Sequence, residues 1–396
     1  MSQRDRDRKP ATRLVEAGRR KEWTGPVVNP PIWRASTHLY EDSADLASGR
    51  PNEDGHFYYG RRGAPTQWAL ADALSELESG AEGTVLYPSG VAAISHTLMA
   101  ILRPGDELLV TDNAYEPTRN IALHTLKRYG IEARPFDPLD VEDFAGMFTG
   151  NVKAVLMESP GSLTLEVADV PALAAIAHEK GAAVVLDNTW ATALGFPALE
   201  RGCDISIMSL TKHVGGHSDL MMGSASAGEP FYAKLRRHSQ SMGQVVSPDD
   251  AALALRGLRT MGVRLERETQ SALAIAGWLS AQPQVSAVLC PMLLAGPGHD
   301  LWQRDFTGGC GLFSFVLKGE DRAIRGRFID ALELFGIGYS WGGFESLAIP
   351  FDPPRTFRRW PPGVAGELGI RLSIGLEDPD DLIRDLAQGL KAASKE

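Results

Sequence analysis

Short apolar runs and helical segments alternate along the chain from about residue 65 onward. Five of the apolar runs are four to six residues long, the length of a buried strand and too short for a helix. These runs occupy residues 84–87, 107–111, 152–157, 182–186 and 205–208. The segments 91–102 and 171–180 between them are interpreted as helices, the second with proline at a tolerated first-turn position. The alternation predicts an α/β domain whose mostly parallel sheet is covered by helices on both faces.

The pattern changes after a long segment, rich in Leu and Ala, that predicts a helix over residues 249–279. Beyond it, residues 311–317 and 369–374 predict strands, and residues 322–335 and 378–393 predict helices. No repeat of solenoid or propeller length is present. This part of the chain therefore predicts a second, smaller domain of the α+β class.

Three parts make up the predicted domain organisation: an N-terminal arm at 1–62, a large domain at 63–256 and a small domain at 257–396. The arm has no clean hydrophobic period and contains Pro26, Pro30 and Pro31. Its first 21 residues carry eight Lys or Arg against three Asp or Glu, which is typical of a solvated arm. Because the arm has no core of its own, we expect it to lie across a neighbouring subunit.

The composition argues against several classes of protein. The net charge of −10 argues against nucleic acid as a partner, because phosphate binding needs a basic face. The N-terminus lacks the apolar core of a signal peptide, and no uncharged apolar run is long enough to span a bilayer. Three widely separated cysteines without a CxxC motif favour neither a disulfide framework nor a zinc ribbon. We expect a soluble cytoplasmic protein.

Polar residues with chemical potential follow three of the predicted strands, where ligands of parallel sheets bind. Ser89-Gly90-Val91 lies between a strand and a helix, so its backbone amides are placed to receive a phosphate. Asp187 ends the apolar run AAVVL, and Ser209, Thr211 and Lys212 follow the next strand. A lysine, a carboxylate and hydroxyls are the groups that pyridoxal phosphate (PLP) requires, for the imine, the ring nitrogen and the phosphate.

Two other patterns suggest a different chemistry, and a proline-flanked segment suggests a further part of the site. Ser209-x-x-Lys212 fits the SxxK motif of serine acylases, but no KTG motif accompanies it. His213 and His217 are four residues apart, but two glycines separate them and no HExxH glutamate is present, so no metal site is predicted. Residues 355–360, between two Pro-Pro pairs, are interpreted as an exposed loop rather than a basic lip on a site.

The motifs around Asp187 and Lys212 resemble those of the Cys/Met-metabolism family of PLP enzymes. The segments LDNTW and SLTKHVGGHSDLMMG carry the resemblance, which extends from VVNPPIWRAST at residues 27–37 to RLSIGLED at 371–378. It implies a large domain of the aspartate-aminotransferase-like fold, fold type I, with PLP as cofactor. Within the family, the chain looks most similar to the bacterial β-lyase branch, including ESPGSLTLE with Ser162 where many relatives carry an asparagine.

The resemblance also implies roles for individual residues. In the large domain, Lys212 is implied as the Schiff-base lysine and Asp187 as the partner of the pyridinium nitrogen. Gly90 and Val91 are implied to donate amides to the phosphate, with hydroxyls from Ser209 and Thr211. Tyr115, in NAYEPT, matches the aromatic residue that stacks on the ring. Tyr59 and Arg61, in YYGRRG, match a pair that reaches the neighbouring subunit's cofactor phosphate, while Tyr339, Ser340, Trp341 and Arg371 match the substrate pocket, with Arg371 on the α-carboxylate.

These roles imply α,β-elimination of an amino-acid thioether by a homo-oligomer. The shared Tyr59 and Arg61 imply a dimer of shared sites, and the family is usually a homotetramer. Lys212 is implied as the general base at Cα, with Tyr115 managing protons near the amine. γ-Synthase or γ-lyase chemistry on the same scaffold is the nearest alternative, and Tyr339-Ser340-Trp341 favours β-elimination over it. A regulatory protein that keeps PLP without turnover is a further alternative, against which the set of Lys212, Asp187, Tyr115 and Arg371 argues.

Overall fold

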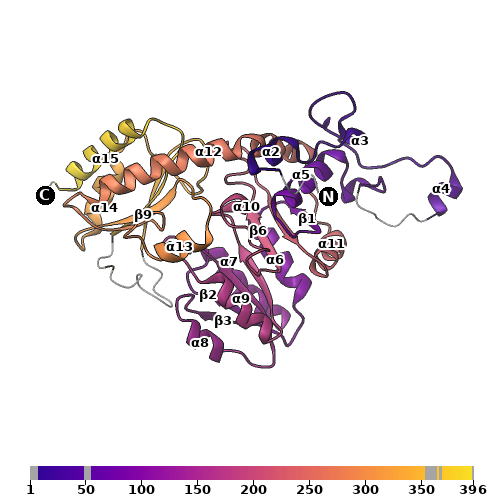
Figure 1. The fold of residues 1–396 in the computed structure, drawn as a ribbon, viewed down its shortest axis with the longest axis horizontal. Coiled ribbons are helices and arrows are strands. Elements are labelled where there is room, and N and C mark those ends of the chain that lie inside the picture. The colour runs from indigo at the N-terminus through magenta and orange to yellow at the C-terminus, as the bar shows by residue number, and fades with distance from the viewer. Residues whose placement is uncertain (1–7, 49–54, 353–363, 365–367, 395–396) are drawn as a thin grey trace.

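The computed structural model of the protein describes residues 8–48, 55–352, 364 and 368–394. Two sheets, each with its own helices, make up most of the molecule, and helix α12 (Pro248–Ser280) runs between them (Figure 1). The predicted boundary at residue 256 lies within this helix. The segment 355–360, interpreted above as an exposed loop, lies outside the described residues. Among the described helices, none is long and apolar enough to cross a membrane.

The large sheet has seven described strands in the order β1-β7-β6-β5-β4-β2-β3. They are β1 (Gly83–Tyr87), β2 (Glu107–Thr111), β3 (Glu132–Phe136), β4 (Val152–Glu158), β5 (Ala183–Asp187), β6 (Ile205–Ser209) and β7 (Gly223–Ala227). The neighbours from β6 to β3 pair in parallel, whereas β7 is antiparallel to both β1 and β6. The expected mostly parallel sheet is therefore confirmed, and the carboxyl ends of β4, β5 and β6 share one edge.

Helices cover this sheet, and their starts follow the chemistry of the chain. The helices are α5 (Pro65–Leu77), α6 (Gly90–Ile101), α7 (Glu116–Asn120), α8 (Val141–Gly146), α9 (Val170–Glu179), α10 (Thr192–Gly195) and α11 (Phe231–Ser241), with turns of π and 3-10 helix at Ile121–Thr125 and Leu126–Tyr129. Ser89, Asp169 and Ser247 cap α6, α9 and α12 by accepting a hydrogen bond from a first-turn amide. The cap at Ser89 fixes where α6 begins, next to the sheet edge.

The second sheet lies in the C-terminal part of the chain and is mostly antiparallel. Its described strands run in the order β10-β11-β12-β9-β8, and they are β8 (Val285–Leu289), β9 (Leu312–Leu317), β10 (Gly336–Ile337), β11 (Leu347–Phe351) and β12 (Leu368–Ser373). Helices α13 (His299–Asp305), α14 (Arg322–Asp330) and α15 (Pro379–Ala393) accompany it. This is the smaller α+β unit that the pattern predicts, although α14 ends at Asp330, before the predicted end at residue 335.

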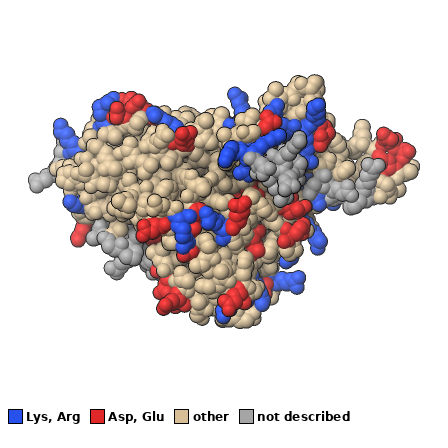
Figure 2. Space-filling model, in the orientation of Figure 1, with Lys and Arg blue, Asp and Glu red and all other residues tan. Residues whose placement is uncertain are grey.

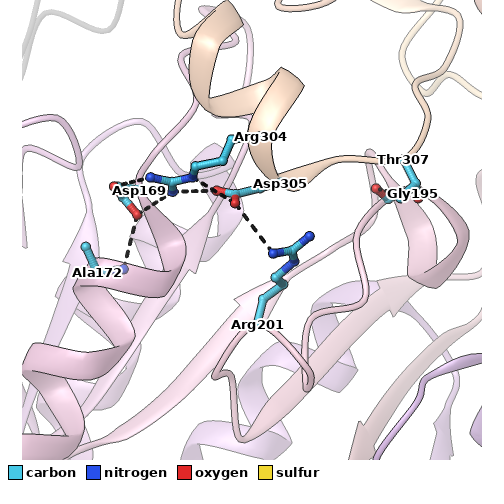
Figure 3. Close-up of polar contacts among 7 residues, drawn as sticks. All are labelled: Asp169, Ala172, Gly195, Arg201, Arg304, Asp305 and Thr307. Carbon is cyan, nitrogen blue, oxygen red and sulfur yellow. Dashed lines mark hydrogen bonds and ion pairs between the residues drawn. The ribbon is translucent and has the colours of Figure 1, made fainter.

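Polar contacts join α13 to the large domain (Figure 3). Arg304 donates from Nη2 to Asp169, which caps α9, at 2.7 Å and to its neighbour Asp305 at 2.6 Å. Arg201 lies 3.7 Å from the other carboxylate oxygen of Asp305, and the backbone N–H of Thr307 donates to the carbonyl of Gly195, in α10, at 2.8 Å. Acidic and basic residues accordingly lie side by side over α13 on the surface in Figure 2. This network anchors α13 and the segment after it to the start of α9 and the end of α10.

The N-terminal segment lies at the opposite end of the molecule from the small domain (Figure 1). Its described helices are α2 (Pro10–Glu16), α3 (Lys21–Thr24) and α4 (Ser43–Ala47), followed by a short 3-10 turn at Gly60–Arg62. Leu14, Ala17 and Trp23 are buried in the core, and Arg259 of α12 donates to the carbonyl of Leu14 at 2.6 Å. Residues 10–24 therefore pack on the core of their own chain, so the expectation that the arm has no core of its own is wrong for this part, while α4 projects away from it.

Candidate active site

A cavity of about 350 Å³ opens at the sheet edge where β4, β5 and β6 end. The first turn of α6 forms a second side of the cavity, and residues of the small domain form the side that faces the sheet edge. Its wall includes the predicted residues Gly90, Val91, Tyr115, Asp187, Ser209, Thr211, Lys212, Tyr339, Ser340, Trp341 and Arg371. The structure thus brings together the residues predicted from the large domain and those predicted from the small domain.

Lys212 stands just beyond β6 and points its amine toward the small domain. Its Nζ donates to Ser340 Oγ at 2.7 Å and lies 5.3 Å from the centre of the Trp341 ring. Burial lowers the pKa of Lys212 to about 8, helped by the charge of Arg371 and opposed by Asp187. A substantial fraction of the amine is therefore neutral near physiological pH, which imine formation and base catalysis both require.

This lowered pKa predicts how the covalent attachment of PLP to the cofactor-free protein depends on pH. The neutral amine fraction rises with pH, so the attachment rate should rise to a midpoint near pH 8. An ordinary lysine, with a pKa of about 10.4, would give a midpoint more than two units higher. Stopped-flow absorbance over pH 6 to 11 measures the profile, and a midpoint above about pH 10 would contradict a buried, depressed Lys212.

Asp187 ends β5 at the floor of the cavity and is held by Thr189. Its Oδ1 accepts hydrogen bonds from the backbone N–H of Thr189 at 3.1 Å and from its hydroxyl at 2.5 Å. Thr189 Oγ1 also accepts the backbone N–H of Ser209 at 2.9 Å, which ties β5 to β6. Burial raises the pKa of Asp187, while Thr189 and the charge of Lys212 oppose the rise. A cationic partner would stabilise the charged form of this half-buried carboxylate.

The end of the cavity nearest α6 is shaped by close backbone approach. A Cβ atom built on Gly90 would lie 2.9 Å from the side chain of Ser209, so only glycine leaves this space open. The amides of Gly90 and Val91 belong to the first turn of α6, where N–H groups have no intrahelical acceptor. Thr211 Oγ1 accepts from the amide of Met222 at 3.0 Å and donates to its carbonyl at 3.2 Å, so this hydroxyl also braces the loop.

Tyr115 lies at the rim of the cavity, 46% exposed, at the start of α7. Its backbone N–H donates to Glu158 Oε2 at 2.6 Å, and Glu158 is the register partner of Asp187 at the strand ends. Burial raises the pKa of Tyr115, and Glu158 adds to the rise, so its hydroxyl stays protonated at neutral pH. Burial likewise raises the pKa of Glu158 well above its ordinary value.

Two residues at this edge, Glu158 and Thr189, were missed from the sequence. Glu158 ends the apolar run VKAVLME as Asp187 ends its own, so the same signal would have found it. Thr189 stands two residues after Asp187 in LDNTW, within reach of the preceding carboxylate.

The small domain contributes the remaining wall. Arg371, on β12, donates from Nη2 to the carbonyl of Ser340 at 2.8 Å. Burial lowers the pKa of Arg371 to about 10, so the guanidinium remains charged at neutral pH. Tyr339 is 89% exposed at the mouth of the cavity, whereas Trp341 is half-buried beside Lys212. The small-domain side of the cavity therefore carries the positive charge of Arg371, which is suited to binding a substrate carboxylate.

Tyr59 and Arg61 do not line this cavity in their own chain. Arg61 Nη1 donates to the carbonyl of Gln240 at 2.6 Å, and its guanidinium lies 6.0 Å from the Tyr59 ring centre. Arg61 lines a separate cavity of about 260 Å³, with Arg20 and Trp68 among its other residues. His213 and His217 also diverge, since His213 faces Glu268 of α12 and His217 Nδ1 lies 2.8 Å from the carbonyl of Gly215.

The residues of the cavity fit PLP. The amine of Lys212 would attach its aldehyde carbon, and the buried carboxylate of Asp187 would pair with its ring nitrogen. The open space at Gly90, with helix amides and the Ser209 hydroxyl around it, suits a phosphate. Tyr115, on the remaining side, would stack on the ring.

This fit predicts that Gly90→Ala weakens PLP binding. The added Cβ would meet Ser209 in the space assigned to the phosphate, so the Kd for PLP should rise about tenfold or more. Gly277→Ala, on α12 with open space at its Cβ, is the matched control and should leave the Kd unchanged. Equilibrium dialysis of both variants checks this, and an unchanged Kd for Gly90→Ala would remove the phosphate from the start of α6.

Comparison with known proteins agrees with the geometry. The family pattern described as "Cys/Met metabolism PLP-dependent enzyme" matches residues 11–391. The chain is 43% identical to cystathionine beta-lyase MetC of Escherichia coli, over 97% of this chain and 98% of that protein. It is 44% identical to a putative cystathionine beta-lyase of Rhizobium johnstonii, over 97% of this chain and 96% of that protein. A crystal structure of metB from Corynebacterium glutamicum superposes with a TM-score of 0.88 at 29% identity, over 98% of this chain and 99% of that one.

Relatives with other activities are more distant. An L-methionine gamma-lyase of Pseudomonas putida is 34% identical, over 97% of this chain and 98% of that protein. An L-alanine/L-glutamate racemase of Wolbachia pipientis is also 34% identical, over 95% of this chain and 96% of that protein. The scaffold is thus shared by proteins named for different reactions, and the residues of the pocket must distinguish them.

Proposed function

The chain belongs to the Cys/Met-metabolism family of PLP-dependent enzymes and is a carbon–sulfur lyase, and we propose that its reaction is α,β-elimination of L-cystathionine. Water and cystathionine would give homocysteine, pyruvate and ammonia. The observation that carries this proposal is the meeting of Lys212, Asp187 and Arg371 in one cavity closed by Tyr339-Ser340-Trp341. The identity of 43% to a cystathionine beta-lyase over nearly the whole chain supports the choice of substrate.

Each residue of the cavity has a task in such a reaction. Arg371 binds the substrate α-carboxylate, which sets the direction of the Cα–H bond. PLP, when bound, supplies an electron sink for the charge that develops at Cα. The Lys212 amine removes the Cα proton, and Ser340 holds that amine through the hydrogen bond to its hydroxyl. The Tyr115 hydroxyl, which is protonated at neutral pH, lies at the rim of the cavity. There it can donate a proton or a hydrogen bond to the departing thiolate.

Product identity tests the proposal directly. Initial rates should be measured with cystathionine, cystine, cysteine, methionine and O-succinylhomoserine, and the keto acids identified by mass. Pyruvate with homocysteine from cystathionine supports the proposal, whereas 2-oxobutyrate would assign γ-elimination. Racemised alanine without keto acid would assign the racemase reaction, and PLP binding with no turnover would assign a regulatory protein. Lys212→Ala should remove the activity, and Lys234→Ala, on α11, should retain it.

We further propose that the active unit is a dimer of shared sites, assembled into a homotetramer. The N-terminal segment supports this, because it exposes apolar side chains at Val27, Val28, Ile32 and Leu39 that a partner would cover. Arg61 is exposed and does not reach the cavity of its own chain. In a symmetric dimer it would reach the partner's cofactor phosphate and form a charge-assisted hydrogen bond.

Hybrid dimers test the shared site. Arg61→Ala and Lys212→Ala chains, co-expressed with different tags, should each be weakly active or inactive alone but recover activity together. In a random mixture half of the dimers are hybrid with one intact site, so about a quarter of wild-type activity should return. A chain that carries both substitutions, co-expressed with itself, is the control. If no activity returns in the hybrid, Arg61 serves its own subunit and the shared site is refuted.

A further inference from the structure

His213 directly follows Lys212 and is buried, with 2% of its surface exposed. Its ring lies between helix α12 and the substrate wall of the small domain. Nδ1 lies 3.5 Å from Glu268 Oε2, and the ring centre lies 5.3 Å from that of Trp341, edge to face. A Cβ built on Gly342 would lie 3.0 Å from Nδ1, so the wall rests directly on this ring.

Glu268 of α12 contacts the ring of His213 from the side opposite the substrate wall. Its carboxylate is fully buried on α12, and among the described residues neither of its oxygens receives a hydrogen bond. The imidazole of His213 lies against this carboxylate, and the guanidinium of Arg264 on the same helix supplies a positive charge nearby. Arg264, one turn earlier on α12, donates to the carbonyl of His213 at 2.8 Å. Helix α12 therefore holds the backbone of His213 through Arg264 and its ring through Glu268.

The wall above His213 needs such support. Ser340 has φ of +85° and Gly342 has φ of +77°, a left-handed backbone that costs a serine about 1 kcal/mol. Outside contacts must therefore hold the turn. Gly342 N donates to Ser373 Oγ at 3.1 Å, and Ser340 Oγ accepts from Lys212 Nζ at 2.7 Å. On the side of the turn that faces α12, the His213 ring packs against Trp341 and Gly342.

We propose that His213, paired with Glu268, is a positioning residue that holds the Ser340–Gly342 turn against Lys212 and thereby sets the fit of the leaving-group half of the substrate. The inference rests on the proposed function for the identity of that half. In this role the pair acts through the Ser340–Gly342 turn, and neither of its side chains touches the substrate. The same pair also connects α12, which runs between the two domains, to the reacting amine.

The position of Trp341 gives a readout that does not depend on turnover. The full-length holoenzyme, labelled with 5-fluorotryptophan, yields ¹⁹F signals among which Trp341→Phe identifies that of Trp341. Glu268→Gln keeps the size of the side chain and replaces the carboxylate by an amide, and it acts on Trp341 through the His213 ring. We expect this variant to shift or broaden the Trp341 signal. The exposed pair His178 and Asp204, 3.0 Å apart on the large domain, supplies the matched control, Asp204→Asn, which should leave the signal in place.

Kinetics then separate positioning from general damage. Glu268→Gln should raise KM for cystathionine about tenfold with kcat within about threefold, and should change KM for the shorter cysteine by less than about threefold. The exchanged pair His213→Glu with Glu268→His restores opposite partners and should recover most of the loss. Should the single variants fail to fold, His213→Phe with Glu268→Leu replaces the pair by apolar groups that fold without it. This double variant should show the same displaced Trp341 signal.

The two proposals fail in different ways. An unmoved Trp341 signal in every folded variant, or equal changes in KM for both substrates, would overturn the role of His213. A displaced Trp341 signal in an enzyme that does not cleave cystathionine would leave that role standing and overturn the proposed reaction.

Discussion

Lys212→Ala is expected to abolish the covalent attachment of PLP and, with it, the visible absorption band of the bound cofactor. The amine at the end of β6 is directed into the cavity, and its lowered pKa of about 8 keeps part of it neutral. Because the same amine would serve as the base at Cα, activity should fall at least about a thousandfold. Absorbance spectra, and mass spectrometry after borohydride reduction, measure the two effects.

A lysine elsewhere on the large domain provides the control. Lys234 lies on α11 with its amine 5.0 Å from the Phe231 ring centre, away from the residues that line the cavity. Lys234→Ala should keep both the band and the activity. Recovery of the reduced cofactor on a peptide without residue 212 would refute the assignment of Lys212.

Arg371→Ala is expected to lower kcat/KM by at least about a hundredfold, mainly through KM, while PLP stays bound. The guanidinium is half-buried and charged, and a substrate carboxylate paired with it gains a charge-assisted bidentate hydrogen bond. Arg371→Lys keeps a charge without the planar fork, so it should fall between the wild type and Arg371→Ala. Steady-state kinetics with cystathionine and the visible spectrum check both expectations.

The control for Arg371 is a surface arginine of the same domain. Arg384, on α15, pairs with Asp381 at the surface, so Arg384→Ala should leave the kinetics unchanged. Arg371 also donates to the carbonyl of Ser340, and a general collapse of that wall would lower kcat as well as raise KM. Wild-type efficiency in Arg371→Ala would mean that the α-carboxylate binds elsewhere.

The alternation of strands and helices was predictable because each element carries its own signal. The strand ending at Asp187 and the strand before Lys212 are continuous apolar runs, and parallel strands bring their carboxyl ends to one edge whatever the helices between them contain. Strand β7 has no such signal, since GSASA is composed of small residues. At one of these positions the structure gives the reason: a Cβ on Gly223 would lie 2.3 Å from the carbonyl oxygen of Ser89, so close packing requires glycine there.

Local patterns in the sequence were enough to locate the candidate residues in the large-domain half of the site. Lys212, Asp187 and Gly90 each follow a strand, so the local pattern was enough to find them, and the family resemblance then implied their roles. The way in which the small-domain half meets these residues depends on tertiary packing. Lys212 reaches Ser340 across 128 residues of chain, and His213 meets Glu268 of α12 only because the two domains pack around that helix. Contacts of this kind depend on the packing of distant segments, which leaves no period or spacing in the sequence.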